Sequence, residues 1–208
     1  MKKEKTVMRV ITGSARGRRL LELEGMETRP TTDRVKEGVF SALQFEIEGR
    51  RVLDLFAGTG QMGIECLSRG AAFAVFVDRR KDAAELVRKN LALTKLADRG
   101  RVVNGDSMEF LAGTREGFDL VFLDPPYASG LLEQALPRLT APGFDILNPY
   151  GIIVAEHPAD RVPPSPAHCR LQRTYRYGKI AVTIFRREGT DGNNEGSAHE
   201  NSHLLRQL

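Results

Sequence analysis

The four residues Asp124, Pro125, Pro126 and Tyr127 carry the strongest chemical signal, because they directly follow the apolar run FDLVFL. A carboxylate and the carbonyl oxygen before a proline can both accept hydrogen bonds from an amine. The prolines fix φ and remove N–H donors that would compete for those acceptors. Tyr127 can stack on a heterocycle. The tetrapeptide therefore suits holding a planar, weakly basic NH2 group beside an electrophile. A strand followed by a proline-stopped turn is the alternative interpretation.

A glycine-rich segment, DLFAGTGQMG at 54–63, lies between an apolar stretch and a helix-like stretch. Glycines at such a place let the backbone turn tightly and approach a ligand closely. The run GTGQMG has the GxGxxG spacing of dinucleotide-binding loops, which is a weak signal by itself. Its position between a strand and a helix indicates a ligand-binding turn.

Aspartates stand at the ends of four successive expected strands: Asp54, Asp78, Asp106 and Asp124. Ligands bind outside the carboxyl ends of strands in open α/β sheets. Asp78 follows the glycines by about 20 residues, where a carboxylate can bind the hydroxyls of a ribose. Asp106, beside Ser107, can reach an adenine edge. One such aspartate is usually a helix cap or a surface residue, but four in step favour a nucleoside-cofactor site.

The elements that must position these residues alternate between strand and helix. Such alternation predicts an α/β, Rossmann-like fold with a mostly parallel twisted sheet covered on both faces. An N-terminal hairpin and helix should precede it, and an antiparallel pair turning at Gly178 should close its C-terminal edge. The expected strands are 8–13, 18–24, 52–56, 71–78, 101–106, 118–124, 151–157, 171–178 and 180–187, with helices after residue 33 and at 64–70, 81–94 and near 130–140.

The charge is unevenly distributed along the chain. Residues 1–36 hold ten lysines and arginines against five acidic residues, while the whole chain has a net charge of +4. A basic end on a near-neutral body is typical of a polyanion-binding surface, although a solvated basic tail gives the same count. We therefore expect a basic N-terminal extension at 1–50 that binds a polyanion, a catalytic domain at 51–187 and a disordered tail at 188–208.

Composition narrows the class of protein. With 208 residues, 41% of them hydrophobic and 28% charged, the chain suits one well-buried globular domain. No apolar run approaches the length of a membrane span, and the N-terminus lacks the apolar stretch of a secretory signal. Cys66 and Cys169 lack metal-ligand spacing, so we expect reduced thiols, a cytoplasmic location and no metal.

Several motifs resemble a known family. The cofactor loop and the DPPY tetrapeptide resemble those of Rossmann-like amino-methyltransferases, and the whole of 8–187 resembles the RsmD-type methyltransferases of 16S ribosomal RNA. The most specific motifs are RVITGSARGRRL at 9–20 and RPTTDRVKEGVFSAL at 29–43. DLFAGTGQMGIECLSRGA, NGD and VFLDPPY accompany them.

The resemblance implies S-adenosylmethionine as the cofactor. Phe56, Gly58 and Gly60 would line its methionine side, Asp78 would bind its ribose hydroxyls, and Asp106 its adenine amine. The full set of implied cofactor contacts is Asp54, Phe56, Ala57, Gly58, Thr59, Gly60, Asp78, Arg79, Asp106, Ser107 and Asp124.

The resemblance also implies the methyl acceptor, the exocyclic N2 amine of a guanine in 16S rRNA of the small ribosomal subunit or its assembly intermediate. The catalytic residues would be Asp124, Pro125, Pro126 and Tyr127, with Asp124 and the Pro125 carbonyl holding the amine and Tyr127 stacked on the base. The expected RNA-binding residues are Arg9, Arg16, Arg18, Arg19, Arg29 and Arg34. We expect a monomer with no membrane contact.

Three other functions fit parts of the pattern. DNA adenine-N6 and cytosine-N4 methyltransferases share the DPPY tetrapeptide but usually have an additional target-recognition region. Protein-glutamine methyltransferases have a related motif that begins with asparagine rather than with an aspartate such as Asp124. A non-catalytic RNA-binding protein that retains the fold is the third, and failure to bind S-adenosylmethionine would favour it.

Overall fold

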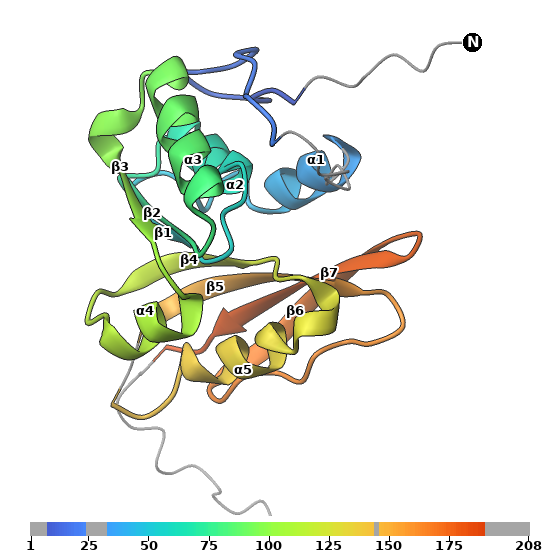
Figure 1. The fold of residues 1–208 in the computed structure, drawn as a ribbon. Coiled ribbons are helices and arrows are strands. Elements are labelled where there is room, and N and C mark those ends of the chain that lie inside the picture. The colour runs from blue at the N-terminus through green and yellow to red at the C-terminus, as the bar shows by residue number, and fades with distance from the viewer. Residues whose placement is uncertain (1–7, 24–32, 144–145, 190–208) are drawn as a thin grey trace, which may run out of the picture.

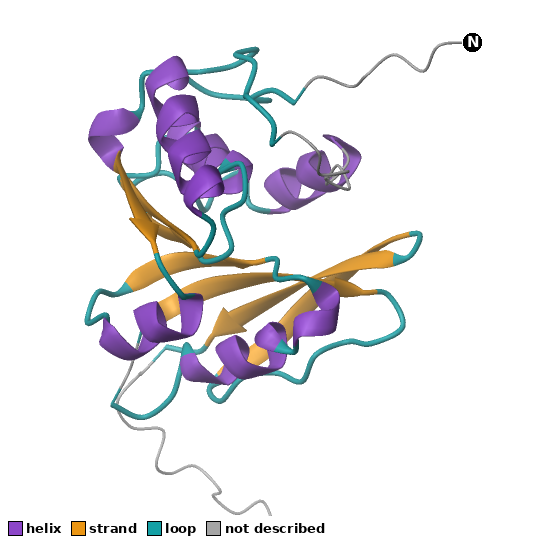
Figure 2. Cartoon of the chain, in the orientation of Figure 1, coloured by secondary structure: helices purple, strands orange, loops and turns teal. Residues whose placement is uncertain are grey.

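Residues 8–23, 33–143 and 146–189 are described by the computed structural model. They form one seven-stranded sheet in the order β3-β2-β1-β4-β5-β7-β6 (Figures 1 and 2). The strands are β1 (Arg51–Asp54), β2 (Phe73–Asp78), β3 (Gly100–Asn104), β4 (Phe118–Leu123), β5 (Leu147–Pro158), β6 (Cys169–Tyr177) and β7 (Ile180–Arg187).

Helices cover both faces of the sheet. One face carries α1 (Asp33–Ala42), α2 (Gln61–Ser68) and α3 (Lys81–Thr94), and the other carries α4 (Ser107–Gly113) and α5 (Leu131–Arg138) (Figure 1). Two short 3₁₀ helices, η1 (Ala97–Arg99) and η2 (Tyr127–Ser129), complete the described elements. None of the helices within these described ranges is long and apolar enough to cross a bilayer.

The sheet pairing confirms the expected α/β fold. β1 to β5 pair in parallel, whereas β7 pairs antiparallel with both β5 and β6. The turn between β6 and β7 contains Gly178 at φ +65°, as the sequence predicts. The chain runs outward from β1 through β2 to β3 and then returns to place β4 on the other side of β1. This reversal opens a crevice beyond the carboxyl ends of β1 and β4, the place where such sheets bind ligands.

Two hydrophobic cores flank the sheet because successive residues of each strand point to opposite faces. Val52, Phe122 and Val154 pack with the α1, α2 and α3 side. Leu53 and Val121 pack with the α4 and α5 side. The face on which the residue at the carboxyl end of a strand lies therefore follows from this alternation.

The N-terminal hairpin is shorter than the sequence predicts. Residues 8–23, here called the N-terminal segment, pair antiparallel at a single bridge between Arg9 and Arg19. Hydrogen bonds from Val10 N to Arg18 O (3.0 Å) and from Leu20 N to Met8 O (2.9 Å) flank it. A longer ladder does not form here, because the next backbone N–H groups, those of Ile11 and Thr12, donate to Glu65 of α2 instead.

Some expectations lie outside the described residues. These are RNA binding by Arg29, the part of the basic extension formed by residues 1–7, and disorder of the tail from residue 190 onward. The other expected strands and helices all appear, with ends that differ by a few residues, and the expected helix at 81–94 matches α3 at both ends.

Candidate active site

The sheet brings two of the four expected carboxylates together in the crevice. Asp54 ends β1 and Asp124 directly follows β4, and these two strands are neighbours. Asp54 pairs with Phe122, so Asp124 lies two residues beyond it on the same face. Asp78 ends β2, one strand further away. Asp106 follows β3 at the distant edge.

The glycine-rich turn is held in place by Asp78. Its Oδ2 accepts a hydrogen bond from Gly58 N at 2.8 Å, and its Oδ1 accepts one from Arg80 N at 2.9 Å. Gly58 and Gly60 have positive φ values of +54° and +77°, and Gly60 precedes the first residue of α2. A Cβ at Gly60 would lie 3.0 Å from Val87 Cγ1, so this position favours glycine for its packing as well as for its φ, whereas Gly58 favours glycine for its φ alone.

Asp106 serves as the cap of α4. Its Oδ1 accepts hydrogen bonds from Met108 N (2.7 Å) and Glu109 N (3.1 Å). These bonds satisfy the otherwise unpaired donors of the first helical turn. Ser107 is buried beside it, and Arg79 is exposed at the end of β2. The cap role of Asp106 is compatible with ligand binding, because a carboxylate has further acceptor positions.

A cleft opens beside these carboxylates. This strand-edge cleft is bordered by Asp54, Phe56 and Ala57 from the end of β1, and by Asp124 after β4. Val35 and Val39 of α1 also border it, as does Glu156 of β5, the strand next to β4. The helix of the expected N-terminal extension thus contributes directly to the site. A neighbouring cleft is bordered by Pro125, Pro126 and Tyr127, and Glu156 borders both.

The DPPY tetrapeptide folds into a fixed turn. Pro126 precedes η2, and its carbonyl accepts a hydrogen bond from Ser129 N at 3.0 Å. The hydroxyl of Tyr127 donates to Glu156 Oε1 at 2.7 Å. This bond fixes the direction of the tyrosine ring relative to β5. Sequence reasoning missed Glu156, although it too follows an apolar run, IIVA, as the aspartates do.

Both carboxyl groups of the crevice have raised pKa values. Burial is the main reason that the pKa of Asp54 is about 7, and the charge of Asp78 adds to it, while a hydrogen bond from Gly63 N opposes it. That bond is 3.1 Å long. The pKa of Asp124 is raised well above its usual range, first by desolvation and then by the charges of Glu156 and Asp54. Asp124 is nevertheless exposed, so its carboxyl group can contact solvent or a ligand although protein atoms surround most of it.

The raised pKa of Asp54 leads to a pH-dependent stability. The folded protein holds a proton that the unfolded chain releases near pH 4, so stability falls as the pH rises toward 7. Asp54→Asn removes this titration but keeps an oxygen for Gly63 N. Denaturant unfolding should show the variant gaining about 3 kcal/mol relative to the wild type between pH 5 and pH 8. A difference that stays constant over this range would contradict a protonated Asp54.

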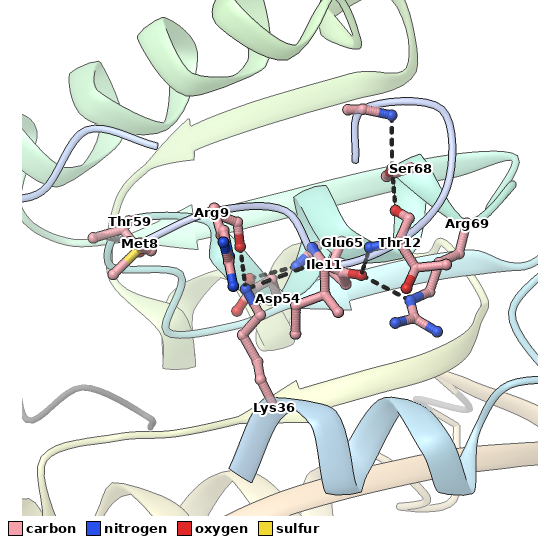
Figure 3. Close-up of polar contacts among 12 residues, drawn as sticks. Met8, Arg9, Ile11, Thr12, Lys36, Asp54, Thr59, Glu65, Ser68 and Arg69 are labelled. Carbon is pink, nitrogen blue, oxygen red and sulfur yellow. Dashed lines mark hydrogen bonds and ion pairs between the residues drawn. The ribbon is translucent and has the colours of Figure 1, made fainter. Parts of the chain in front are cut away.

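The N-terminal segment is fastened to α2 by a buried carboxylate. Glu65 Oε2 accepts a hydrogen bond from Ile11 N at 2.7 Å, and Oε1 accepts one from Thr12 N at 2.9 Å (Figure 3). Its other partners are Arg69 Nε at 2.9 Å and Lys36 Nζ at 3.9 Å. Glu65 is fully buried.

The same segment contacts the glycine-rich turn. Asn90 of α3 accepts a hydrogen bond from Leu21 N at 2.8 Å and donates to the carbonyl of Thr59 at 2.9 Å. Thr59 Oγ1 also lies 3.4 Å from the sulfur of Met8. The basic segment and the turn expected to bind the cofactor are therefore joined through α3 and through direct contact.

The arginines expected to bind RNA are placed on the surface. Arg9, Arg16, Arg18, Arg19 and Arg34 are all exposed. Arg18 also donates to the carbonyl of Leu93 at 2.8 Å, so it helps to hold the N-terminal segment against α3. Arg16 and Arg19 are the better probes of an electrostatic surface.

Comparisons with known proteins agree with this architecture. A family model described as "Conserved hypothetical protein 95" matches residues 8–186. The YlbH protein of Bacillus subtilis is 40% identical over 186 residues, which cover 88% of this chain and 100% of that protein. Ribosomal RNA small subunit methyltransferase D of Escherichia coli is 38% identical over 181 residues, covering 87% and 90%. A solved structure of an Escherichia coli protein superposes with a TM-score of 0.79 at 38% identity, covering 88% and 98%.

Proposed function

The chain belongs to the family described as conserved hypothetical protein 95, the RsmD family, and from this premise we propose that it methylates small-subunit ribosomal RNA. The reaction moves a methyl group from S-adenosylmethionine to the N2 amine of a guanine in 16S rRNA. One observation supports this most directly. A carboxylate followed by Pro-Pro-Tyr opens into the same cleft as the end of a glycine-rich cofactor turn.

The residues in and beside the strand-edge cleft fit this cofactor. Phe56 and Ala57 border the cleft, whereas Gly58, Gly60, Asp78 and Asp106 are not among the residues that line it. Gly58 and Gly60 themselves present no side chain to a ligand, and the ring of Phe56 is apolar. Asp78 would bind the ribose hydroxyls, and Asp106 the adenine amine, each with acceptor positions beyond those the fold uses. Ala57, Thr59, Arg79 and Ser107 would complete the contacts around it. When bound, S-adenosylmethionine supplies an electrophilic methyl group on a positively charged sulfur.

The residues after β4 would bind the guanine N2 amine that accepts the methyl group. The N2 lone pair of guanine is delocalised into the ring, so the amine is a poor nucleophile. Asp124 and the Pro125 carbonyl accept hydrogen bonds from its two hydrogens, which favours pyramidal geometry and stabilises the positive charge that develops. Tyr127 stacks on the base. The base must leave its helical stack to reach this position, and positioning supplies much of the remaining rate.

Asp54 has an electrostatic role in this proposal. Its pKa of about 7 means that it changes charge near neutral pH, next to the place where a cationic sulfur would lie. A positive charge there favours the ionised form of Asp54. Asp54 would therefore help to hold the charged cofactor in preference to its neutral, demethylated product.

The N-terminal part of the chain would bind the RNA. We assign residues 1–50 to RNA binding and 51–187 to catalysis, with α1 shared between them because it borders the cleft. The expected monomer acts in the cytoplasm, on the small subunit or an assembly intermediate of it.

The basic surface gives a prediction that is independent of turnover. Replacing Arg16 and Arg19 together with alanine should weaken binding to small-subunit RNA, because two phosphate contacts are lost. The slope of log affinity against log salt should fall by about 1.5 units, measured by filter binding. Arg115 and Arg138 are exposed on the α4 and α5 side and serve as matched controls. An unchanged slope in the Arg16/Arg19 variant would place the RNA surface elsewhere.

The experiment that tests the proposed function uses methyl-labelled S-adenosylmethionine. Hypomethylated small subunits, their naked RNA and duplex DNA are offered in parallel. Label should enter the subunits or their RNA and not the DNA. Label in DNA as methyladenine or methylcytosine would keep the cofactor assignment and overturn the substrate class.

A further inference from the structure

Glu156 lies next to Asp124 on the neighbouring strand. β4 and β5 are parallel, and Leu123 pairs with Ala155, so Asp124 and Glu156 are the next residues on each strand. Residues paired in this way point to the same face. That face is the α1 side, because Phe122 and Val154, two residues earlier, pack in the core there. Two carboxylates thus stand side by side in one cleft.

The position of Glu156 is fixed by the DPPY turn. Tyr127 donates its hydroxyl hydrogen to Glu156 Oε1 at 2.7 Å, and Glu156 borders both the strand-edge cleft and the cleft beside the prolines. A carboxylate can accept as many as four hydrogen bonds, so the bond from Tyr127 does not prevent it from accepting one from a ligand. The side chain is partly buried.

Two adjacent acceptors suit a ligand with two adjacent donors. Guanine has the N1–H donor next to its N2 amine. In adenine the ring atom next to the N6 amine is N1, an acceptor, and in cytosine the atom next to the N4 amine is N3, also an acceptor. A carboxylate beside the amine-binding aspartate would attract the first arrangement and repel the other two.

We propose that Glu156 selects guanine, by accepting the hydrogen bond of guanine N1–H while Asp124 holds the N2 amine. This inference rests on the proposed function and adds a residue that determines base specificity. It also gives a physical reason why the site rejects adenine and cytosine, the bases methylated by DNA enzymes that share the DPPY tetrapeptide. Tyr127 has a second task in this arrangement, which is to hold Glu156 in position.

The test compares two bases that both carry a 2-amino group. The methylated guanosine is first mapped with the wild-type protein. Small-subunit RNA is then ligated around a synthetic segment that has either guanosine or 2,6-diaminopurine riboside at that position, and it is assembled with the subunit proteins. The diaminopurine keeps the 2-amine but presents a lone pair at N1. The wild type should prefer guanosine in kcat/KM by a factor on the order of 100 or more.

Glu156→Gln should reduce this preference by roughly tenfold or more, because glutamine can accept guanine N1–H with its amide oxygen or donate its NH2 to the diaminopurine N1. Glu85→Gln is the matched control rather than Glu133→Gln, because Glu133 borders the cleft beside the prolines together with Glu156. Glu85 is an exposed glutamate of α3 that lies 3.9 Å from Lys81, and this variant should keep the wild-type preference. Where the Glu156 variant turns over too slowly, the affinity ratio for the two RNAs, measured with S-adenosylhomocysteine present, gives the same comparison.

The outcomes separate this inference from the function on which it rests. A wild type that labels no guanine in any substrate would overturn the proposed function. A second result would be that the wild type labels guanine while Glu156→Gln lowers kcat/KM by the same factor on guanosine and on diaminopurine RNA. That result would show that Glu156 only positions Tyr127. Tyr127→Phe should then reproduce that equal loss. A reduced preference for guanosine confined to the Glu156 variant would support Glu156 as the residue that reads the base.

Discussion

Asp124→Ala should lower the rate of methyl transfer roughly 1,000-fold while affinity for S-adenosylmethionine stays within a few-fold of the wild-type value. The reason is that its carboxylate acts on the amine, whose charge develops only in the transition state, whereas the cofactor has many other contacts. Single-turnover kinetics give the rate, and isothermal calorimetry gives the affinity. Asp124→Asn, which keeps one acceptor oxygen, should lie between the alanine variant and the wild type.

A control separates this effect from a general effect on folding. Asp160 is an exposed aspartate that follows β5, and its replacement with alanine should leave both the rate and the affinity unchanged. The assignment of Asp124 to the amine would be wrong if Asp124→Ala lost cofactor affinity and turned over normally once saturated. It would also be wrong if the rate fell by less than about tenfold, which is below the usual effect of removing such an acceptor.

Glu65→Ala should lower the free energy of unfolding by about 3–5 kcal/mol, because it breaks a buried charge network. The fully buried carboxylate holds the backbone of Ile11 and Thr12 and contacts Lys36 and Arg69. Without this carboxylate, the N–H groups of Ile11 and Thr12 lose their buried acceptor, and the Lys36 ammonium group loses a nearby negative charge. Denaturant unfolding measures the loss, and amide hydrogen exchange at Ile11 and Thr12 should rise more than exchange in the sheet.

The matched control for this variant is an exposed glutamate on a neighbouring helix. Glu85→Ala on α3 removes a pair with Lys81 at 3.9 Å and should change stability by no more than about 0.5 kcal/mol. Equal, small effects of the two substitutions would mean that Glu65 does not hold the N-terminal segment. If exchange rises throughout the protein rather than in that segment, the network stabilises the whole fold instead.

Sequence alone predicted the elements whose signals are local. The helix at 81–94 was predictable at both ends because it has charged residues at its start and a continuous apolar stripe. β1, β2 and β4 were predictable because they are buried on both faces and read as apolar runs. The turn at Gly178 was predictable because glycine adopts its φ of +65° readily.

Contacts between distant segments could not be predicted in this way. Glu65 occurs on a short helix, where a glutamate usually points to solvent, and its burial depends on Lys36 and on the backbone of the N-terminal segment. The same contacts explain why the expected hairpin is reduced to one bridge. The adjacency of Glu156 and Asp124 depends on the register of β4 with β5, which two separate apolar runs do not specify.

The identity of the methylated nucleoside tests the proposed function most directly. Small subunits that lack the modification are incubated with S-adenosylmethionine and either the wild-type protein or Asp124→Ala. Their RNA is then digested to nucleosides and separated by chromatography with mass detection. The proposed function predicts N2-methylguanosine that appears with the wild type and is absent with Asp124→Ala. A different methylated nucleoside, or no product with RNA or subunits, would contradict it.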